Sequence, residues 1–233
     1  MCKRLITRRQ LVTGMSALSL AAMLPRWGQA LERGPSKITM DQAMTWLREG
    51  NRRFANRSLR QPNLTVRRQR ELADTGQHPF ATIISCSDSR VPVEMVFDRG
   101  LGDLFVVRVA GNVADTDEIA TCEYGIGHLA TPLLVVLGHS QCGAVTAVVK
   151  QTPLPGKLPL LVDNIQPAVD RARTLITRPD EDALILAAVK ENVRQSLADI
   201  FRGSEEITRL TQQGRMAAVG GVYHVETGEV EWL

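Results

Sequence analysis

Aromatic residues are scarce in this chain of 233 residues, and the sequence lacks repeats and biased segments. Aromatics make up 4% of the residues, although 44% are hydrophobic, so we predict a core of aliphatic side chains. The absence of internal repeats and low-complexity segments excludes a repeat array and extensive disorder. The length is sufficient for one domain with a buried core.

The sequence also lacks an apolar run long enough to span a bilayer comfortably. The stretch from Leu11 to Leu24 is short and rich in Ala, Ser and Gly. A twin-arginine pattern around Arg8 and Arg9 precedes it, and the small-residue site Gly28-Gln29-Ala30 follows it. We therefore predict a cleaved export signal over residues 1–30, a single domain over residues 31–233 and a periplasmic protein without stable membrane insertion. A retained membrane-anchoring helix is the alternative.

A large excess of charge is absent once this signal is set aside. The whole chain has a formal net charge of +3, but five of its basic residues and none of its acidic residues lie in residues 1–30. Removing them leaves a net charge of −2, which argues against nucleic acid as a partner. Several arginines remain between residues 48 and 70, and we interpret them as a solvated face or a contact between subunits.

Only three cysteines lie beyond residue 30, an odd number that excludes a framework of paired disulfides. Cys86 begins the string Cys-Ser-Asp-Ser-Arg, and Cys142 lies in His139-Ser-Gln-Cys-Gly. Each string follows an apolar run typical of a buried parallel strand, residues 80–85 and 133–138. Because α/β proteins bind ligands at the carboxyl ends of such strands, the three side chains can converge there. Two thiolates and one imidazole suit zinc, with a fourth position open to water.

Helical and extended patterns alternate along the chain, which predicts an α/β fold. We expect a mainly parallel central sheet flanked by helices, with an N-terminal helical arm and a C-terminal edge strand. The predicted helices cover 40–55, 92–97 and 117–130. A further helix follows a break at residues 62–65 and ends at Thr75, another opens after Gly143, and a helical core stripe runs from Leu186 to Ile200. The predicted strands are 80–85, 104–109, 133–138 and a final pair within 217–233, and residues 152–159 are predicted to form a loop.

Two other interpretations of the cysteine strings remain open from the residues alone. A thiol nucleophile activated by His139 is chemically feasible, but it leaves the second cysteine unexplained. A structural zinc site requires four protein ligands, and Asp88 is the residue near enough in sequence to complete it.

The two strings resemble the zinc-binding signature of the β-class carbonic anhydrases. The resemblance extends from about Asn51 to Val149, is weaker toward the C-terminus, and includes Phe105–Arg108, Ala110–Asn112 and Glu123-Tyr124. It implies reversible, zinc-dependent hydration of carbon dioxide to bicarbonate and a proton. It assigns one zinc ion per subunit to Cys86, His139 and Cys142, and a catalytic dyad that orients the activated water to Asp88 and Arg90.

The resemblance also bears on the state of the zinc site and on the quaternary structure. Gln77 matches a glutamine that donates a hydrogen bond to substrate in plant-like members, and Ile83 replaces a tryptophan of the allosteric bacterial members. Both favour an open site over a closed one in which Asp88 becomes the fourth zinc ligand. The family builds its sites at a dimer interface, so a homodimer or homotetramer is implied, with the N-terminal helices wrapping the partner. Three further residues match the small apolar substrate pocket, although each also suits an ordinary core: Phe105, Ala110 and Tyr124.

Two alternative functions accompany this expectation. The same scaffold and zinc chemistry would serve a hydrolase of carbonyl sulfide or carbon disulfide, and the shape of the pocket decides between these substrates. The second alternative is a zinc-binding module without catalytic activity.

Overall fold

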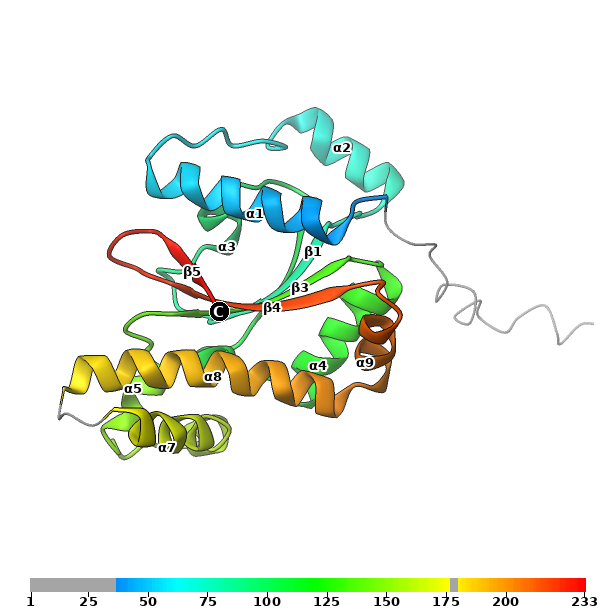
Figure 1. The fold of residues 1–233 in the computed structure, drawn as a ribbon. Coiled ribbons are helices and arrows are strands. Elements are labelled where there is room, and N and C mark those ends of the chain that lie inside the picture. The colour runs from blue at the N-terminus through cyan, green and yellow to red at the C-terminus, as the bar shows by residue number, and fades with distance from the viewer. Residues whose placement is uncertain (1–36, 177–179) are drawn as a thin grey trace, which may run out of the picture. The chain divides into compact units, whose positions relative to one another are not determined.

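A five-stranded sheet lies at the centre of the computed structural model, which describes residues 37–176 and 180–233 (Figure 1). Its strand order is β2-β1-β3-β4-β5. The first four strands are parallel and the last pairs antiparallel with β4, which confirms the predicted sheet and its C-terminal edge strand. The strands are β1 (Ala81–Ser85), β2 (Leu104–Arg108), β3 (Leu133–His139), β4 (Ala217–Tyr223) and β5 (Val230–Trp232).

The two central strands, β1 and β3, are buried along their whole length. Because side chains alternate between the faces of a strand, each strand contributes to two hydrophobic cores. Ile84, Leu134 and Val136 belong to one core, whereas Ile83 and Val135 belong to the other. Strands that are apolar on both faces are typical of a parallel sheet covered by helices on both sides.

The long helix α8 (Glu181–Gly203) lies along one face of the sheet, and α7 (Gln166–Leu175) packs on its outer side (Figure 1). Val189, Val193 and Ile200 of α8 are fully buried, so most of the predicted core stripe faces the sheet as expected. Four further helices contribute side chains to the core on this face of the sheet: α4 (Thr116–Glu123), α5 (Gly143–Val149), α6 (Leu158–Val162) and α9 (Glu205–Gln212).

Helix α1 (Met40–Ala55) covers the opposite face, close to the short helix α3 (Val93–Val96), and α2 (Val66–Thr75) follows α1 in the chain (Figure 1). Thr39 caps α1 through a reciprocal pair of hydrogen bonds with Gln42. Ala43 and Leu47 bury the inner side of α1 in the second core. A Cβ atom at Gly50 would lie 1.8 Å from the carbonyl oxygen of Phe97, so only glycine permits this close packing.

The structure differs from the sequence-based expectation in three places. The helix predicted over 117–130 ends as α4 at Glu123 and continues as a single π-helical turn, η3 (Tyr124–His128). This turn packs tightly on β1, since a Cβ atom at Gly125 would lie 2.2 Å from Thr82 Oγ1. The end of the predicted loop 152–159 already belongs to α6, and neither α7 nor α9 was expected.

Two further predictions concern the start of the chain and the membrane. The predicted export signal, residues 1–30, lies outside the described residues. Within the described ranges, none of the helices has the length and apolar character needed to cross a membrane.

Candidate active site

The three predicted metal ligands meet at the carboxyl edge of the sheet. Cys86 directly follows β1, His139 ends β3, and Cys142 precedes α5. Because β1 and β3 are adjacent and parallel, with Ser85 opposite Leu137, their ends bring the strings together across 53 positions of sequence. The ligand atoms of all three side chains lie within 4.8 Å of one another, and all three residues are buried.

The imidazole of His139 presents one nitrogen to this cluster. Its Nδ1 atom lies 2.8 Å from the carbonyl oxygen of Ser140, so we assign the proton to Nδ1 and a lone pair to Nε2. The Nε2 atom is buried and has no hydrogen-bond partner among the described residues. A buried nitrogen without a partner is costly in a folded protein, whereas a metal ion would satisfy it.

The two sulfurs of the cluster compete for one proton. The hydrogen bond with Cys142 lowers the pKa of Cys86 to about 4, and the N–H group of Gly111, whose nitrogen is 3.2 Å from the sulfur, also lowers it. The same interaction, followed by burial, raises the pKa of Cys142 far above its usual value. A divalent cation would displace that proton and balance both thiolates, so these residues fit a zinc ion.

Asp88 and Arg90 form a tight pair beside the cluster. Arg90 donates from its backbone nitrogen (2.9 Å) and Nε (3.0 Å) to Oδ1 of Asp88, and from Nη2 to Oδ2 (2.8 Å). The Arg90 side chain thereby holds the pKa of Asp88 well below its usual range. Oδ2 of Asp88 lies 3.8 Å from His139 Nε2. The structure therefore places an ionised carboxylate next to the side chains of the predicted metal ligands.

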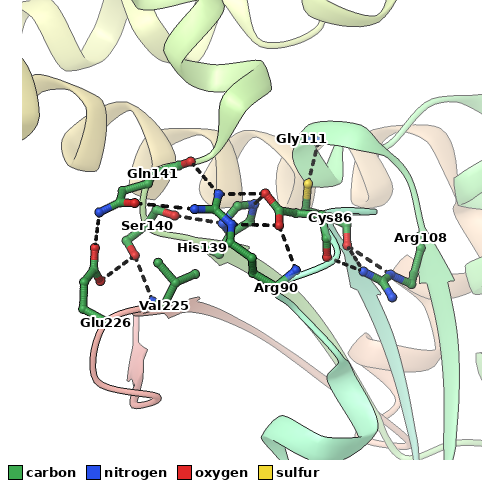
Figure 2. Close-up of polar contacts among 10 residues, drawn as sticks. Cys86, Arg90, Arg108, Gly111, His139, Ser140, Gln141, Val225 and Glu226 are labelled. Atoms are coloured by element: carbon green, nitrogen blue, oxygen red, sulfur yellow. Dashed lines mark hydrogen bonds and ion pairs between the residues drawn. The ribbon is translucent and has the colours of Figure 1, made fainter.

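A second arginine, Arg108, fixes the backbone of the first string (Figure 2). From the carboxyl end of β2, its guanidinium donates two hydrogen bonds to the carbonyl oxygen of Cys86 (3.1 and 3.0 Å) and one to that of Asp88 (2.7 Å). Arg108 belongs to the motif Phe105–Arg108 but had no predicted role. Its position opposite Ser85 on a neighbouring strand is the signal that places it at the same edge of the sheet.

The loop that donates to Cys86 is held by α8. Gly111 has φ +73°, and a Cβ atom there would lie 2.7 Å from Ile165 Cδ1, so both conformation and space require glycine. Asn192 donates to the carbonyl oxygen of Gly111 (2.7 Å), and Ser196 donates to that of Asn112 (2.9 Å). These buried polar residues of α8 thus support Cys86, a predicted metal ligand, indirectly.

The four predicted substrate-binding residues do not all lie at this cluster within one subunit. Ala110 is adjacent to Gly111 and lies at the same edge. Phe105 instead pairs with Thr82, about 13 Å from Cys86 along the strand at 3.3 Å per residue. The ring of Tyr124 packs 5.7 Å from that of Phe105, and Gln77 precedes β1. These three residues therefore lie near the amino end of β1, whereas the cluster lies at its carboxyl end.

Comparison with known proteins identifies the family. The sequence model of the carbonic anhydrase family matches residues 81–230. A relative described as carbonic anhydrase 2 of Mycobacterium tuberculosis is 37% identical over 186 residues, which cover 78% of this chain and 87% of that protein. The carbonic anhydrase of Mycolicibacterium smegmatis is 35% identical over 191 residues, which cover 79% and 89% of the two chains.

Solved structures agree with the sequence relatives. The β-carbonic anhydrase CafA of Aspergillus fumigatus superimposes with a TM-score of 0.64 at 27% identity, covering 72% of this chain and 82% of that one. The β-carbonic anhydrase CcaA gives a TM-score of 0.63 at 31% identity, covering 81% and 94%. The chain therefore belongs to the carbonic anhydrase family and, within it, to the β class.

Proposed function

We propose that this carbonic anhydrase hydrates carbon dioxide reversibly at a zinc ion held by Cys86, His139 and Cys142, with one ion per subunit. The observation that carries the metal assignment is the buried Nε2 of His139, which has no hydrogen-bond partner in the described structure and lies with two sulfurs inside a 4.8 Å cluster. Bound zinc supplies a water molecule activated near neutral pH for attack on carbon dioxide. Family membership supports the reaction itself.

Asp88 and Arg90 orient the reacting water in this proposal. Asp88 Oδ2 lies 3.8 Å from His139 Nε2, close enough to accept a hydrogen bond from a water beside that nitrogen. Because Arg90 keeps the pKa of Asp88 low, the carboxylate accepts this hydrogen bond but does not retain the proton. Two thiolate ligands already balance the charge of a divalent ion, so a positioned acceptor is needed more here than at a site with neutral ligands.

The same contacts support an open metal site. A closed site would require an oxygen of Asp88 to become the fourth ligand. Both oxygens of Asp88 are engaged by Arg90, and this bidentate arrangement would have to be broken or shared. We therefore propose that water is the fourth ligand, as expected from Gln77 and Ile83.

A second copy of the chain would complete the substrate pocket. Gln77, Phe105 and Tyr124 lie away from the cluster of their own subunit, and Tyr124 is about half exposed, at 47%. Placing these residues against the partner's cluster would reconcile their position with the role that the family resemblance gives them. Related β-carbonic anhydrases of Sordaria macrospora are described as tetrameric. Light scattering should find a homodimer or homotetramer; a monomer with full activity would refute this arrangement.

The experiment that tests the function compares three reactions on one zinc-loaded sample. Stopped-flow hydration of carbon dioxide should be rapid, and sulfide release from carbonyl sulfide and carbon disulfide should be slow. Rapid sulfide release with negligible hydration at alkaline pH would make the protein a hydrolase of those sulfur compounds. Asp88→Asn should retain zinc and lose about 10²-fold in kcat/KM. Unchanged hydration in Asp88→Asn would refute the proposed dyad.

We also propose export to the periplasm, which the sequence pattern of residues 1–30 supports. Mass spectrometry of the exported protein should find a chain that begins near Leu31. An intact Met1 on exported material would argue for the retained helix instead.

A further inference from the structure

Arg90 requires more than Asp88 to hold its position. Its side chain is 46% exposed, and an exposed ion pair orders two side chains only weakly. A loose guanidinium would let the carboxylate of Asp88 rotate. The dyad therefore depends on whatever fixes the other side of Arg90.

Gln141 supplies that second contact from the other string. Arg90 Nη2 donates to the carbonyl oxygen of Gln141 (3.1 Å), and Nη1 approaches its side-chain Oε1 (3.5 Å). Gln141 adopts the left-handed conformation, with φ +55°, which is unfavourable for a residue with a side chain. Such a conformation must be stabilised by neighbouring contacts.

Glu226, in the turn between β4 and β5, provides these contacts (Figure 2). Gln141 Nε2 donates to Oε1 of Glu226, and Ser140 Oγ donates to Oε2 (3.0 Å). Ser140 Oγ also accepts from the backbone nitrogen of Val225 (3.0 Å). A carboxylate only accepts hydrogen bonds. Glu226 therefore turns the NH₂ group of Gln141 toward itself and the amide oxygen toward Arg90.

We propose that Glu226 is a positioning residue for carbon dioxide hydration. It fixes the orientation of the Gln141 amide, Gln141 fixes the guanidinium of Arg90, and Arg90 holds Asp88 beside the metal-binding atoms. Within the described residues, the Glu226 side chain accepts hydrogen bonds from Ser140 and Gln141 and from none of the predicted metal ligands. This inference rests on the function proposed above for Asp88 and Arg90.

The test measures kcat/KM of zinc-loaded variants at buffer concentrations that do not limit proton transfer. Glu226→Ala should lower kcat/KM about tenfold while retaining one zinc per subunit and the wild-type circular dichroism spectrum. Glu226→Gln keeps an oxygen acceptor for Gln141 and should stay within about threefold of the wild type. Glu229→Ala, an exposed position in the same turn, serves as the matched control and should be unaffected.

A double-mutant cycle separates positioning from support of the fold. If Glu226 acts through the Gln141 amide, adding Glu226→Ala to Gln141→Ala should lower kcat/KM by less than about twofold further. If the losses in kcat/KM of the two single variants multiply in the double variant, the two residues act independently and the inference is overturned. Equal losses in Glu226→Ala and Glu226→Gln, or a loss of zinc that parallels the loss of activity, would overturn it as well.

Arg90→Ala distinguishes failure of the inference from failure of the proposed function. We expect this variant to lose at least as much kcat/KM as Glu226→Ala. If Arg90→Ala is impaired and Glu226→Ala is fully active, only the role of Glu226 is refuted. If Arg90→Ala is fully active, the dyad itself is refuted.

Discussion

Single atoms determine what the site can bind. His139 uses Nδ1 for a hydrogen bond to its neighbour's carbonyl group and leaves Nε2 facing two sulfurs. Cys122 offers a contrast, because it is also buried but its pKa is raised to about 12 by burial and by nearby Glu118 and Glu123. A thiol in such surroundings keeps its proton and does not bind metal. Burial alone therefore does not make a cysteine a ligand.

This contrast gives a prediction for the cysteines. Cys86→Ser removes a thiolate from the cluster and should reduce bound zinc to well below one ion per subunit, because two protein ligands hold zinc poorly. Cys122→Ala is the matched control and should retain the full content. Elemental analysis of the purified proteins measures both. Full zinc occupancy in Cys86→Ser would refute the ligand assignment.

The three predicted metal ligands stood out in the sequence because their strings follow apolar runs that mark the ends of strands, whereas the dyad was assigned only through the resemblance to the β-class carbonic anhydrases. Gln141 lies within the second string but was given no role, and Glu226 follows no such run. Their contact joins residues 85 positions apart and depends on how the C-terminal turn folds back over the second string. Glu226 lies in an ordinary Glu-Thr-Gly turn, so the sequence alone gave no reason to connect it with Arg90.

Helix α8 connects the fold to the metal cluster. Its apolar stripe packs on the sheet, while Asn192 and Ser196 hold the loop that contains Gly111. The apolar stripe was predictable from helical periodicity. The role of Asn192 was not, because a polar residue between apolar ones gives no indication of its partner. The helix α7 was missed for a related reason: it buries mainly the small residues Ala168 and Ala172, which produce a weak periodic signal.

Asn192→Ala tests this connection. The carbonyl group of Gly111 would lose its buried partner, which should cost about 1–3 kcal/mol of stability. The looser loop should also release zinc to a chelator several-fold faster. Arg194→Ala, on the exposed side of the same helix, should change neither the melting temperature nor the rate of zinc release. Wild-type stability and zinc release in Asn192→Ala would contradict this account of α8.

An ion pair between Arg53 and Asp98 joins α1 to the segment after α3. Burial alone would raise the pKa of Asp98, but the Arg53 side chain and the N–H groups of Gln61 and Arg60 outweigh it and hold the pKa below its usual value. The folded protein thus keeps Asp98 ionised at a pH where the unfolded chain binds a proton. The stability that Asp98 contributes is present above its unfolded pKa, near 3.9, and is lost as pH falls toward the folded value.

Asp98→Asn should therefore change how the free energy of unfolding depends on pH in the acidic range. The variant should unfold more easily at pH 7, by about 1–3 kcal/mol, and should lose less stability than the wild type between about pH 5 and pH 3. Urea unfolding at fixed protein concentration measures both effects. The exposed Asp74→Asn is the control. Parallel pH profiles for wild type and Asp98→Asn would show that Asp98 is not the group responsible.

For the molecule as a whole, two hydrophobic cores on the two faces of one parallel sheet hold the strand ends in place. The apolar runs indicated β1, β2 and β3 to within a residue or two, since strands buried on both faces are almost continuously hydrophobic. The positions of Gln77, Phe105 and Tyr124 relative to the cluster could not be predicted from the sequence. Their distance from the cluster in one subunit became apparent only from the register of the sheet.

X-ray absorption at the zinc edge of the loaded protein measures the ligands of the metal directly. We expect two sulfur neighbours at about 2.3 Å and one nitrogen and one oxygen at about 2.0–2.1 Å. A shell with one sulfur or none would contradict the metal centre formed by Cys86, His139 and Cys142.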